Sequence, residues 1–150
     1  MIYLISLIVF LVDFTSKFWV MKALIPHDPV PVFPCFNLYL TFNPGVSFSM
    51  FSAQSAMGVW TLVALTAGIS ALIIYFIQKE TETLSRIGLA MVLGGAIGNL
   101  ADRIRFGSVV DFLDFYWGIY HWPAFNVADS AICIGAILIL FQCMRKGTKK

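Results

Sequence analysis

Polar residues that could do chemistry stand within or next to long apolar segments of this 150-residue sequence. Five aspartates are among them: Asp13, Asp102, Asp111, Asp114 and Asp129. A carboxylate is costly to keep in an apolar environment, and two carboxylates held together there do not both ionise readily. One keeps its proton while the other can activate a water molecule, an arrangement that hydrolyses amide bonds without a metal.

Other catalytic groups are poorly represented in the sequence. The cysteines form no C-x-x-C pair and have no histidine at a metal-ligand spacing. The histidines, His27 and His121, fall in segments rich in aromatic residues and proline, and we interpret them as interfacial residues. We therefore expect no metal site and no cofactor, and an aspartate pair is the chemistry that remains.

The composition decides the class of protein. Hydrophobic residues make up 59% of the chain and charged residues only 12%, and the mean hydropathy is +0.85. These values are typical of an integral membrane protein. The formal net charge of +2 is too small to indicate a nucleic-acid partner. We expect a single membrane-embedded domain over residues 1–150.

Four apolar segments are long enough to cross a membrane as helices, namely residues 1–22, 57–78, 84–103 and 126–144. Four glycines interrupt the third segment, and small residues at such spacing favour close helix packing. We expect this segment to be the central helix of the bundle. The connecting outer loops are then residues 23–56 and 104–125.

The basic residues indicate the orientation. They gather in residues 79–86 and again after the fourth span, so both segments are predicted to be cytoplasmic and both termini to lie inside. Lys22, Arg103 and Arg105 count against this orientation but less heavily. In the first outer loop, partial alternation predicts a short hairpin with a turn at Asn43-Pro44-Gly45. The second outer loop is strongly aromatic, which is typical of the membrane interface.

Polar residues lie at one depth near the outer ends of the predicted spans. Asp13 and Lys17 are four residues apart, so they share a helix face and can form an ion pair. Asn126 is placed to cap the fourth span, with Asp129 in its first turn at the positive end of the helix dipole. The other members follow the outer end of the third span: Asn99, Asp102, Arg103, Asp111 and Asp114.

Simpler roles compete with chemistry at several of these positions. Taken alone, Asp129 is explained as well by helix capping as by catalysis. A structural ion pair is favoured for Asp13 and Lys17, and Asp114 is expected to be a solvated loop acid. The number of polar groups at one depth favours a catalytic site, and spacing alone does not choose between Asp102 and Asp111 as the partner of Asp129.

Five motifs, in order along the chain, carry a resemblance to a known family. They are "DFTSK" in the first span, "NPGVSF" in the first outer loop, "GGAIGNLADR" in the third span, "VVDF" after it and "FNVAD" at the start of the fourth. In these motifs the sequence resembles the lipoprotein signal peptidases, or type II signal peptidases, of bacterial inner membranes. The similarity covers essentially the whole chain. Ser47 departs from the pattern, because the family usually has alanine there.

The resemblance implies a fold and an activity. The fold is an all-α integral membrane protein of four transmembrane helices, with a small extracytoplasmic β-sheet in the first outer loop. The activity is that of a metal-independent aspartic endopeptidase, which removes signal peptides from prolipoproteins by cutting before a cysteine that carries diacylglycerol. The expected partners are these prolipoproteins and membrane lipids, and we expect a monomer.

The resemblance also implies roles for individual residues. The catalytic pair would be Asp111 and Asp129, with Asp102 as the rival for the first place. The supporting polar positions would be Asn99, Arg103, Asn126, Asn43, Gly45, Asp13 and Lys17. The site would lie near the outer leaflet. The alternative is a small transporter or proton-relay subunit in which Asp13, Asp102 and Asp129 carry ions, but the inner halves of the first, second and fourth spans offer no ionisable residues to continue such a path.

Overall fold

Four helices form most of the computed structural model, which describes residues 1–45, 47–48, 51–52 and 56–147. They are α1 (Ile2–Ala23), α2 (Ala56–Lys79), α3 (Thr83–Phe106) and α4 (Val127–Gly147). Each is long and apolar enough to cross a membrane. They agree with the four predicted spans, and α3 and α4 each continue three residues past the predicted ends at residues 103 and 144.

Helix α3 is the central helix, as its glycines predict. In its most apolar stretch 50% of the residues are buried, against 17% to 22% in the other three helices. A Cβ added at Gly88 would lie 2.6 Å from the carbonyl oxygen of Gly135 in α4, and one added at Gly94 would lie 2.6 Å from that of Ser6 in α1. The glycines therefore let the backbones of α1 and α4 approach α3 directly.

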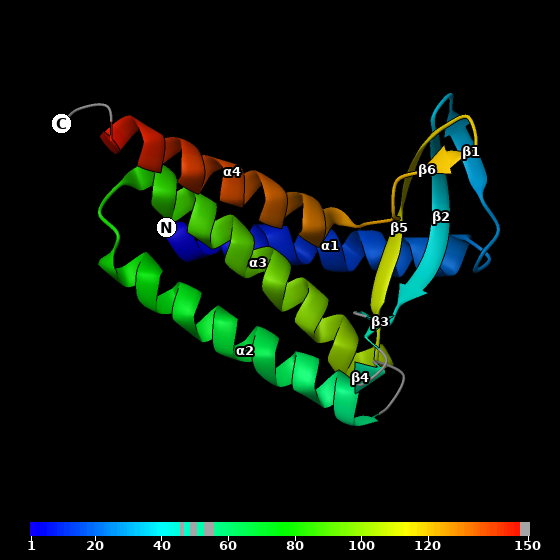
Figure 1. Ribbon diagram of the computed structural model, residues 1–150, viewed down its shortest axis with the longest axis horizontal. Coiled ribbons are helices and arrows are strands. Elements are labelled where there is room, and N and C mark those ends of the chain that lie inside the picture. The colour runs from blue at the N-terminus through cyan, green and yellow to red at the C-terminus, as the bar shows by residue number, and fades with distance from the viewer. Residues whose placement is uncertain (46, 49–50, 53–55, 148–150) are drawn as a thin grey trace.

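A four-stranded antiparallel sheet caps one end of the helices (Figure 1). Its strand order is β1 (Val30–Phe33), β2 (Phe36–Asn43), β5 (Val109–Trp117) and β6 (Tyr120–His121), so it draws on both outer loops. A separate pair joins β3 (Ser47–Phe48) to β4 (Phe51–Ser52). Aromatic and β-branched residues dominate β2 and β5, as suits a pleated, half-buried surface.

The sheet corrects two predictions. The hairpin expected at Asn43-Pro44-Gly45 is wrong, because β2 ends at Asn43 and its bonded neighbours are β1 and β5. The sheet is also not confined to the first outer loop, since the aromatic second loop supplies β5 and β6. The side chain of Ser47 lies outside the described residues. The pairing of β2 with the distant β5 leaves no local signal in the sequence, which explains the second error.

The register of β5 sets the direction of its two aspartates. Asp111 pairs with Thr41 and Asp114 with Asn37, with an irregularity between Leu38 and Thr41 in β2. Side chains three positions apart on a strand point to opposite faces. Asp111 and Asp114 therefore belong to different environments although they are close in sequence.

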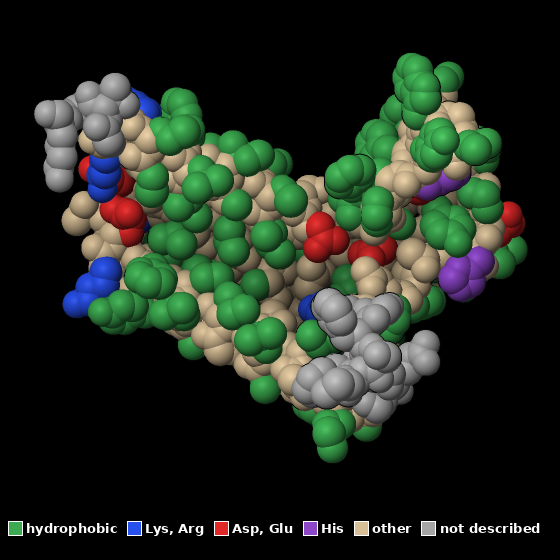
Figure 2. All heavy atoms as spheres, in the orientation of Figure 1, with side chains coloured by type: hydrophobic (Ala, Val, Ile, Leu, Met, Phe, Trp, Pro, Cys, Tyr) green, Lys and Arg blue, Asp and Glu red, His purple; other side chains and the backbone are tan. Residues whose placement is uncertain are grey.

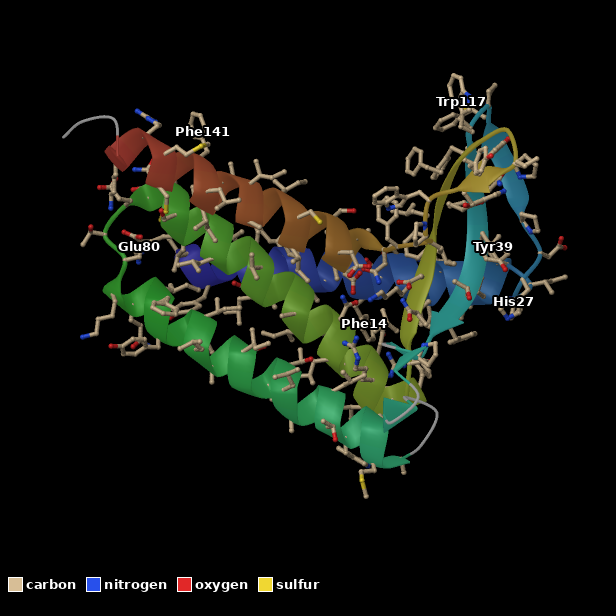
Figure 3. All side chains as sticks on the ribbon, viewed as in Figure 1. Phe14, His27, Tyr39, Glu80, Trp117 and Phe141 are labelled. Carbon is tan, nitrogen blue, oxygen red and sulfur yellow. The ribbon has the colours of Figure 1, made fainter. Side chains whose placement is uncertain are left out.

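The other end of the bundle holds the α2–α3 connection and the end of α4 (Figure 1). There Lys146 Nζ lies 3.7 Å from Glu80 Oε1 and 3.5 Å from Glu82 Oε1. Figure 3 shows Glu80 at this end, with Tyr39 and His27 at the sheet end. The N-terminus also lies at the end opposite the sheet (Figure 1).

Candidate active site

Asp111 projects from β5 into the protein, where only 1% of its surface is exposed. Both carboxylate oxygens accept hydrogen bonds from side-chain amides. Asn126 Nδ2 donates to Oδ1 over 2.7 Å, and Asn43 Nδ2 donates to Oδ2 over 2.9 Å. The Asn43 amide is itself held, because the Gly45 N–H donates to its Oδ1 over 2.9 Å. Gly45 has a φ of 98°, a conformation that favours glycine.

Asp129 lies in the first turn of α4 and is half-buried. Its N–H donates to Asn126 Oδ1 over 2.9 Å, while the Asn126 N–H donates to Asp129 Oδ2 over 3.2 Å. These reciprocal bonds form a capping box at the start of the helix. Asn99 Nδ2 donates to the remaining oxygen, Oδ1, over 2.8 Å. Asn126 therefore caps the helix as predicted. The cap uses only Oδ2 of the Asp129 carboxylate and leaves Oδ1 for the bond with Asn99.

Asn126 connects the two aspartates. It is fully buried, and its Nδ2 lies near Asp111 Oδ1, Asn99 Oδ1 at 3.2 Å and the carbonyl oxygen of Val110 at 3.2 Å. At the same time its backbone N–H donates to the Asp129 carboxylate, and its Oδ1 accepts the Asp129 N–H. Asp111 from β5 and Asp129 from α4 are thus both hydrogen-bonded to Asn126.

Lys17 forms the centre of a second buried cluster beside the first. Its ammonium lies 2.7 Å from Asp13 Oδ2 and 2.8 Å from Asp102 Oδ2, and it donates to Asn99 Oδ1 over 3.1 Å. The predicted ion pair of Asp13 and Lys17 is therefore present. Asp102 lies against Lys17 and accepts the Val110 N–H over 3.1 Å, whereas Asp111 shares Asn126 with Asp129.

Arg103 borders both clusters from the last turns of α3. Its Nη1 donates to the carbonyl oxygen of Asn99 over 3.3 Å. Its Nε is buried and has no hydrogen-bond partner within the described part of the chain. The guanidinium charge interacts electrostatically with the carboxylates of Asp129, Asp111 and Asp102. Arg103 thus supplies positive charge beside the aspartates without a direct hydrogen bond to them among the described contacts.

Burial has a clear electrostatic effect on Asp111. Removal from water raises its pKa to about 6, from a usual value of 3.8. The hydrogen bond from Asn43 opposes the rise, and the negative charge of Asp129 adds to it. A carboxyl group with this pKa retains its proton far more readily than a solvated aspartate does. Burial therefore favours the protonated form of Asp111 relative to a solvated aspartate.

The pair lies where the helices meet the sheet. Side-chain oxygen and nitrogen atoms gather between β5 and the start of α4 (Figure 3). Figure 2 shows acidic side chains at the floor of a hollow between the helical body and the sheet, with hydrophobic side chains on both walls. A substrate that enters this hollow would meet acidic side chains beside apolar surface.

The prediction for Asp114 is wrong. Only 4% of its surface is exposed, and it accepts hydrogen bonds from Asn37 Nδ2 at 2.9 Å and pairs with His121 Nδ1 at 2.8 Å. His121, predicted only as an interfacial residue, is the partner of this buried carboxylate. A cavity of about 450 Å³ adjoins them, lined by Pro29, Tyr39, Asp114, His121, Trp122, Pro123 and Ala124. Strand alternation from Asp111 was the signal that could have placed Asp114 on the opposite face.

Together, the helices, the sheet and the buried polar cluster define a multi-pass membrane protein with a carboxylate site at one end of its helices. Two solved structures share this fold, and both are described as bacterial membrane enzymes studied by the in meso method. One has a TM-score of 0.85 and 28% sequence identity, covering 98% of this chain and 89% of that one. The other has a TM-score of 0.82 and 29% identity, covering 93% and 90%.

A family model described as Signal peptidase (SPase) II matches residues 5–145, so this chain belongs to that family. Curated relatives agree. The lipoprotein signal peptidase of Polynucleobacter necessarius subsp. necessarius (strain STIR1) is 43% identical over 147 residues, which covers 97% of this chain and 90% of the relative. That of Vibrio vulnificus (strain CMCP6) is 43% identical over 145 residues, covering 94% and 86%.

Proposed function

We propose that this protein removes signal peptides from prolipoproteins by an aspartic mechanism, in which Asp111 and Asp129 cleave the bond before a diacylglyceryl-modified cysteine. Family membership supports the class of reaction and substrate. The single observation that carries the catalytic assignment is the bridge through Asn126, whose side chain bonds Asp111 and whose backbone bonds Asp129.

The two aspartates have different environments and take different roles. Asp129 takes the role of base, because its carboxylate accepts hydrogen bonds from the Asn99 amide and the Asn126 N–H at the N-terminus of α4. Asp111 takes the role of acid, because burial raises its pKa to about 6 and so makes its protonated form more accessible than that of a solvated aspartate. Asp129 is thus the general base and Asp111 the general acid in the free enzyme.

The reaction runs in two proton-balanced steps. Asp129 takes a proton from water as the water oxygen bonds to the scissile carbonyl carbon, and Asp111 gives its proton to the carbonyl oxygen. The tetrahedral intermediate then collapses. Asp129 passes its proton to the leaving amine as the C–N bond breaks, and the hydroxyl proton returns to Asp111 as the new carboxylic acid forms.

The supporting residues hold this pair without adding negative charge. Asn43, Asn99 and Asn126 give neutral amide donors to the carboxylates. Arg103 brings positive charge near the developing oxyanion. The groups around Lys17 position α1, α3 and α4 against one another.

The membrane explains the lipid requirement. The carboxylates lie near the ends of helices that can span a bilayer, below a sheet with exposed aromatic residues such as Trp117 and Trp122. A diacylglyceryl substrate reaches such a site with its acyl chains still in the bilayer. We place the site at the outer leaflet of the bacterial inner membrane with both termini cytoplasmic, and we propose a monomeric single domain over residues 1–150.

A direct test uses purified protein in detergent or lipid with two substrates. One is a prolipoprotein carrying the diacylglyceryl group and the other is its unmodified precursor. We expect cleavage of the first, with the lipid-bearing cysteine as the new N-terminus, and no cleavage of the second. Cleavage of both, or of neither by a well-folded protein, contradicts the proposal.

A transporter or proton relay remains less well supported. The ionisable residues at the end opposite the sheet, such as Glu80, Glu82 and Lys146, bond to one another there. No observation on the described residues favours a charged path between that end and the aspartates.

A further inference from the structure

The ammonium of Lys17 is buried, with 2% of the side chain exposed. An ammonium has three N–H donors and no acceptor. Its three partners are Asp13 Oδ2 at 2.7 Å, Asp102 Oδ2 at 2.8 Å and Asn99 Oδ1 at 3.1 Å. Two carboxylate oxygens and one amide oxygen therefore surround the ammonium. The carboxylates of Asp13 and Asp102 compensate the positive charge of Lys17. The contact with the neutral Asn99 amide needs a separate explanation.

Each partner of Lys17 leads to a segment that carries a catalytic aspartate. Asp102 Oδ2 accepts the Val110 N–H over 3.1 Å, one residue before Asp111. Asp13 Oδ1 accepts the Ala128 N–H over 2.9 Å, one residue before Asp129. The most direct connection from Lys17 to a catalytic aspartate passes through Asn99, because Asn99 Nδ2 donates directly to Asp129 Oδ1 over 2.8 Å.

The contact with Lys17 gives the Asn99 amide a defined orientation. Its Oδ1 receives the Lys17 ammonium and, over 3.2 Å, the Asn126 amide, so its Nδ2 faces Asp129. In the reversed orientation the NH₂ group would face two donors and the oxygen would face the Asp129 carboxylate. All three contacts would then be repulsive. Because the Lys17 ammonium can only donate hydrogen bonds, it excludes the reversed orientation of the Asn99 amide.

We propose that Lys17 is a positioning residue that fixes the orientation of the Asn99 amide and so holds the Asp129 carboxylate in place for reaction. The inference rests on the proposed function of the aspartate pair. Lys17 does not touch the reacting atoms. Its effect passes through Asn99, so loss of Lys17 and loss of Asn99 remove the same contribution to the rate.

A double-mutant cycle tests this pathway. Lys17→Met and Asn99→Ala are each expected to lower kcat by about 100-fold, the scale of losing one preorganised donor or misplacing a reacting group. In the Asn99→Ala background, Lys17→Met is expected to lower kcat by less than about fivefold, since residues that act through one contact are not additive. Lys22→Met, which removes an exposed lysine from the same helix, is the matched control and keeps the wild-type kcat.

Stability is controlled separately because Lys17→Met leaves two buried carboxylates without their cation. Lys17→Met is therefore also made in an Asp13→Asn/Asp102→Asn background, where removal of both carboxylates leaves no unpaired charge beside position 17. Thermal unfolding in detergent confirms that each variant is folded at the assay temperature. In this triple variant, Asn99→Ala is expected to lower kcat further by less than about fivefold.

The pH profile supplies a readout that a purely structural role would not move. The Lys17 charge lowers the pKa of Asp111, so its removal moves the basic limb of kcat/KM to higher pH. Effects of Lys17→Met and Asn99→Ala that multiply, or a folded Lys17→Met protein with wild-type kcat, overturn the inference. A wild-type protein that fails to cleave overturns the proposed function as well, so the two failures are distinguishable.

Discussion

Asn126 and Asp129 are bonded to each other in both directions, with the Asp129 N–H 2.9 Å from Asn126 Oδ1 and the Asn126 N–H 3.2 Å from Asp129 Oδ2. This pair begins helix α4. The side-chain nitrogen of Asn126, Nδ2, donates to Asp111 Oδ1 over 2.7 Å, its shortest contact. One residue therefore caps a helix and joins two carboxylates from different elements, so helix capping and catalysis are compatible roles for Asp129.

Replacement of Asn126 tests that double role. Asn126→Ala removes a cap, which costs about 1 kcal/mol of stability, and also removes a donor from Asp111. We expect kcat to fall by about 100-fold. Asn37→Ala is the matched control, because Asn37 also donates from a buried amide to an aspartate, Asp114, on the other face of β5. Its loss is expected to lower the melting temperature and to leave kcat within about threefold.

Equal activity in the two asparagine variants would show that the Asn126 amide has no special relation to the reaction. Activity is therefore measured at a temperature where both variants are folded.

The glycine at position 98 is expected to be intolerant of even one methyl group. A Cβ there would lie 2.5 Å from Asp13 Oδ2, the atom that faces Lys17. Gly98→Ala must displace Asp13 and is expected to cost about 1 to 3 kcal/mol, together with most of the activity. Gly68→Ala in α2, where the added Cβ meets nothing within 4 Å, is expected to be neutral or slightly stabilising.

Thermal unfolding and cleavage assays on the two glycine variants check this prediction. If Gly98→Ala is as stable and active as Gly68→Ala, the close approach of α1 to α3 at this level is wrong.

The stability of the protein is expected to depend on pH through Asp111. Its folded-state pKa of about 6 lies above the usual 3.8, so the folded state binds the proton more tightly than the unfolded state. This contribution is complete below pH 3.8 and is lost as pH rises through 6. Its size is about 3 kcal/mol, since each pKa unit corresponds to about 1.4 kcal/mol.

Asp111→Asn removes this titration. Melting temperatures of the variant and the wild type, measured from pH 4 to pH 8 in one detergent, should diverge in favour of the variant as pH rises. A difference that stays constant over this range would contradict the raised pKa.

Metal chelation is expected to leave activity unchanged. Groups of three or more histidine, cysteine, aspartate or glutamate side chains that could hold a metal ion are absent from the described residues. In the proposed mechanism the carboxylate pair activates water by proton transfer and needs no Lewis acid. Cleavage after dialysis against EDTA checks this, and activity that is lost and then restored by a divalent cation would sink the aspartic mechanism.

Much of the fold follows from local sequence. Hydropathy and length define the four spans, because each membrane helix must satisfy its own backbone hydrogen bonds. The glycines of α3 identify it as the central helix for an equally local reason, since small residues allow close packing. The gathering of Asp13, Lys17, Asn99 and Asp129 at one level follows from their positions along helices of known rise.

The sheet and the partner of Asp129 are harder to predict. Pairing of β2 with β5 joins residues about 70 positions apart, and only the folded chain determines which strands meet. That pairing places Asp111 beside Asn126 and Asp114 on the opposite face beside His121. Spacing alone likewise could not separate Asp102 from Asp111, because the salt bridge that binds Asp102 comes from Lys17 on another helix.

The most direct test of the central claim is the cleavage rate of a diacylglyceryl-modified prolipoprotein by four isosteric variants. Asp111→Asn and Asp129→Asn are each expected to abolish cleavage with little change in melting temperature near pH 5. Asp114→Asn changes a carboxylate that is equally buried on the same strand but faces away from the pair, and it is expected to retain activity. Cleavage by Asp111→Asn or Asp129→Asn at the wild-type rate would contradict the assignment, as would loss in Asp102→Asn alone.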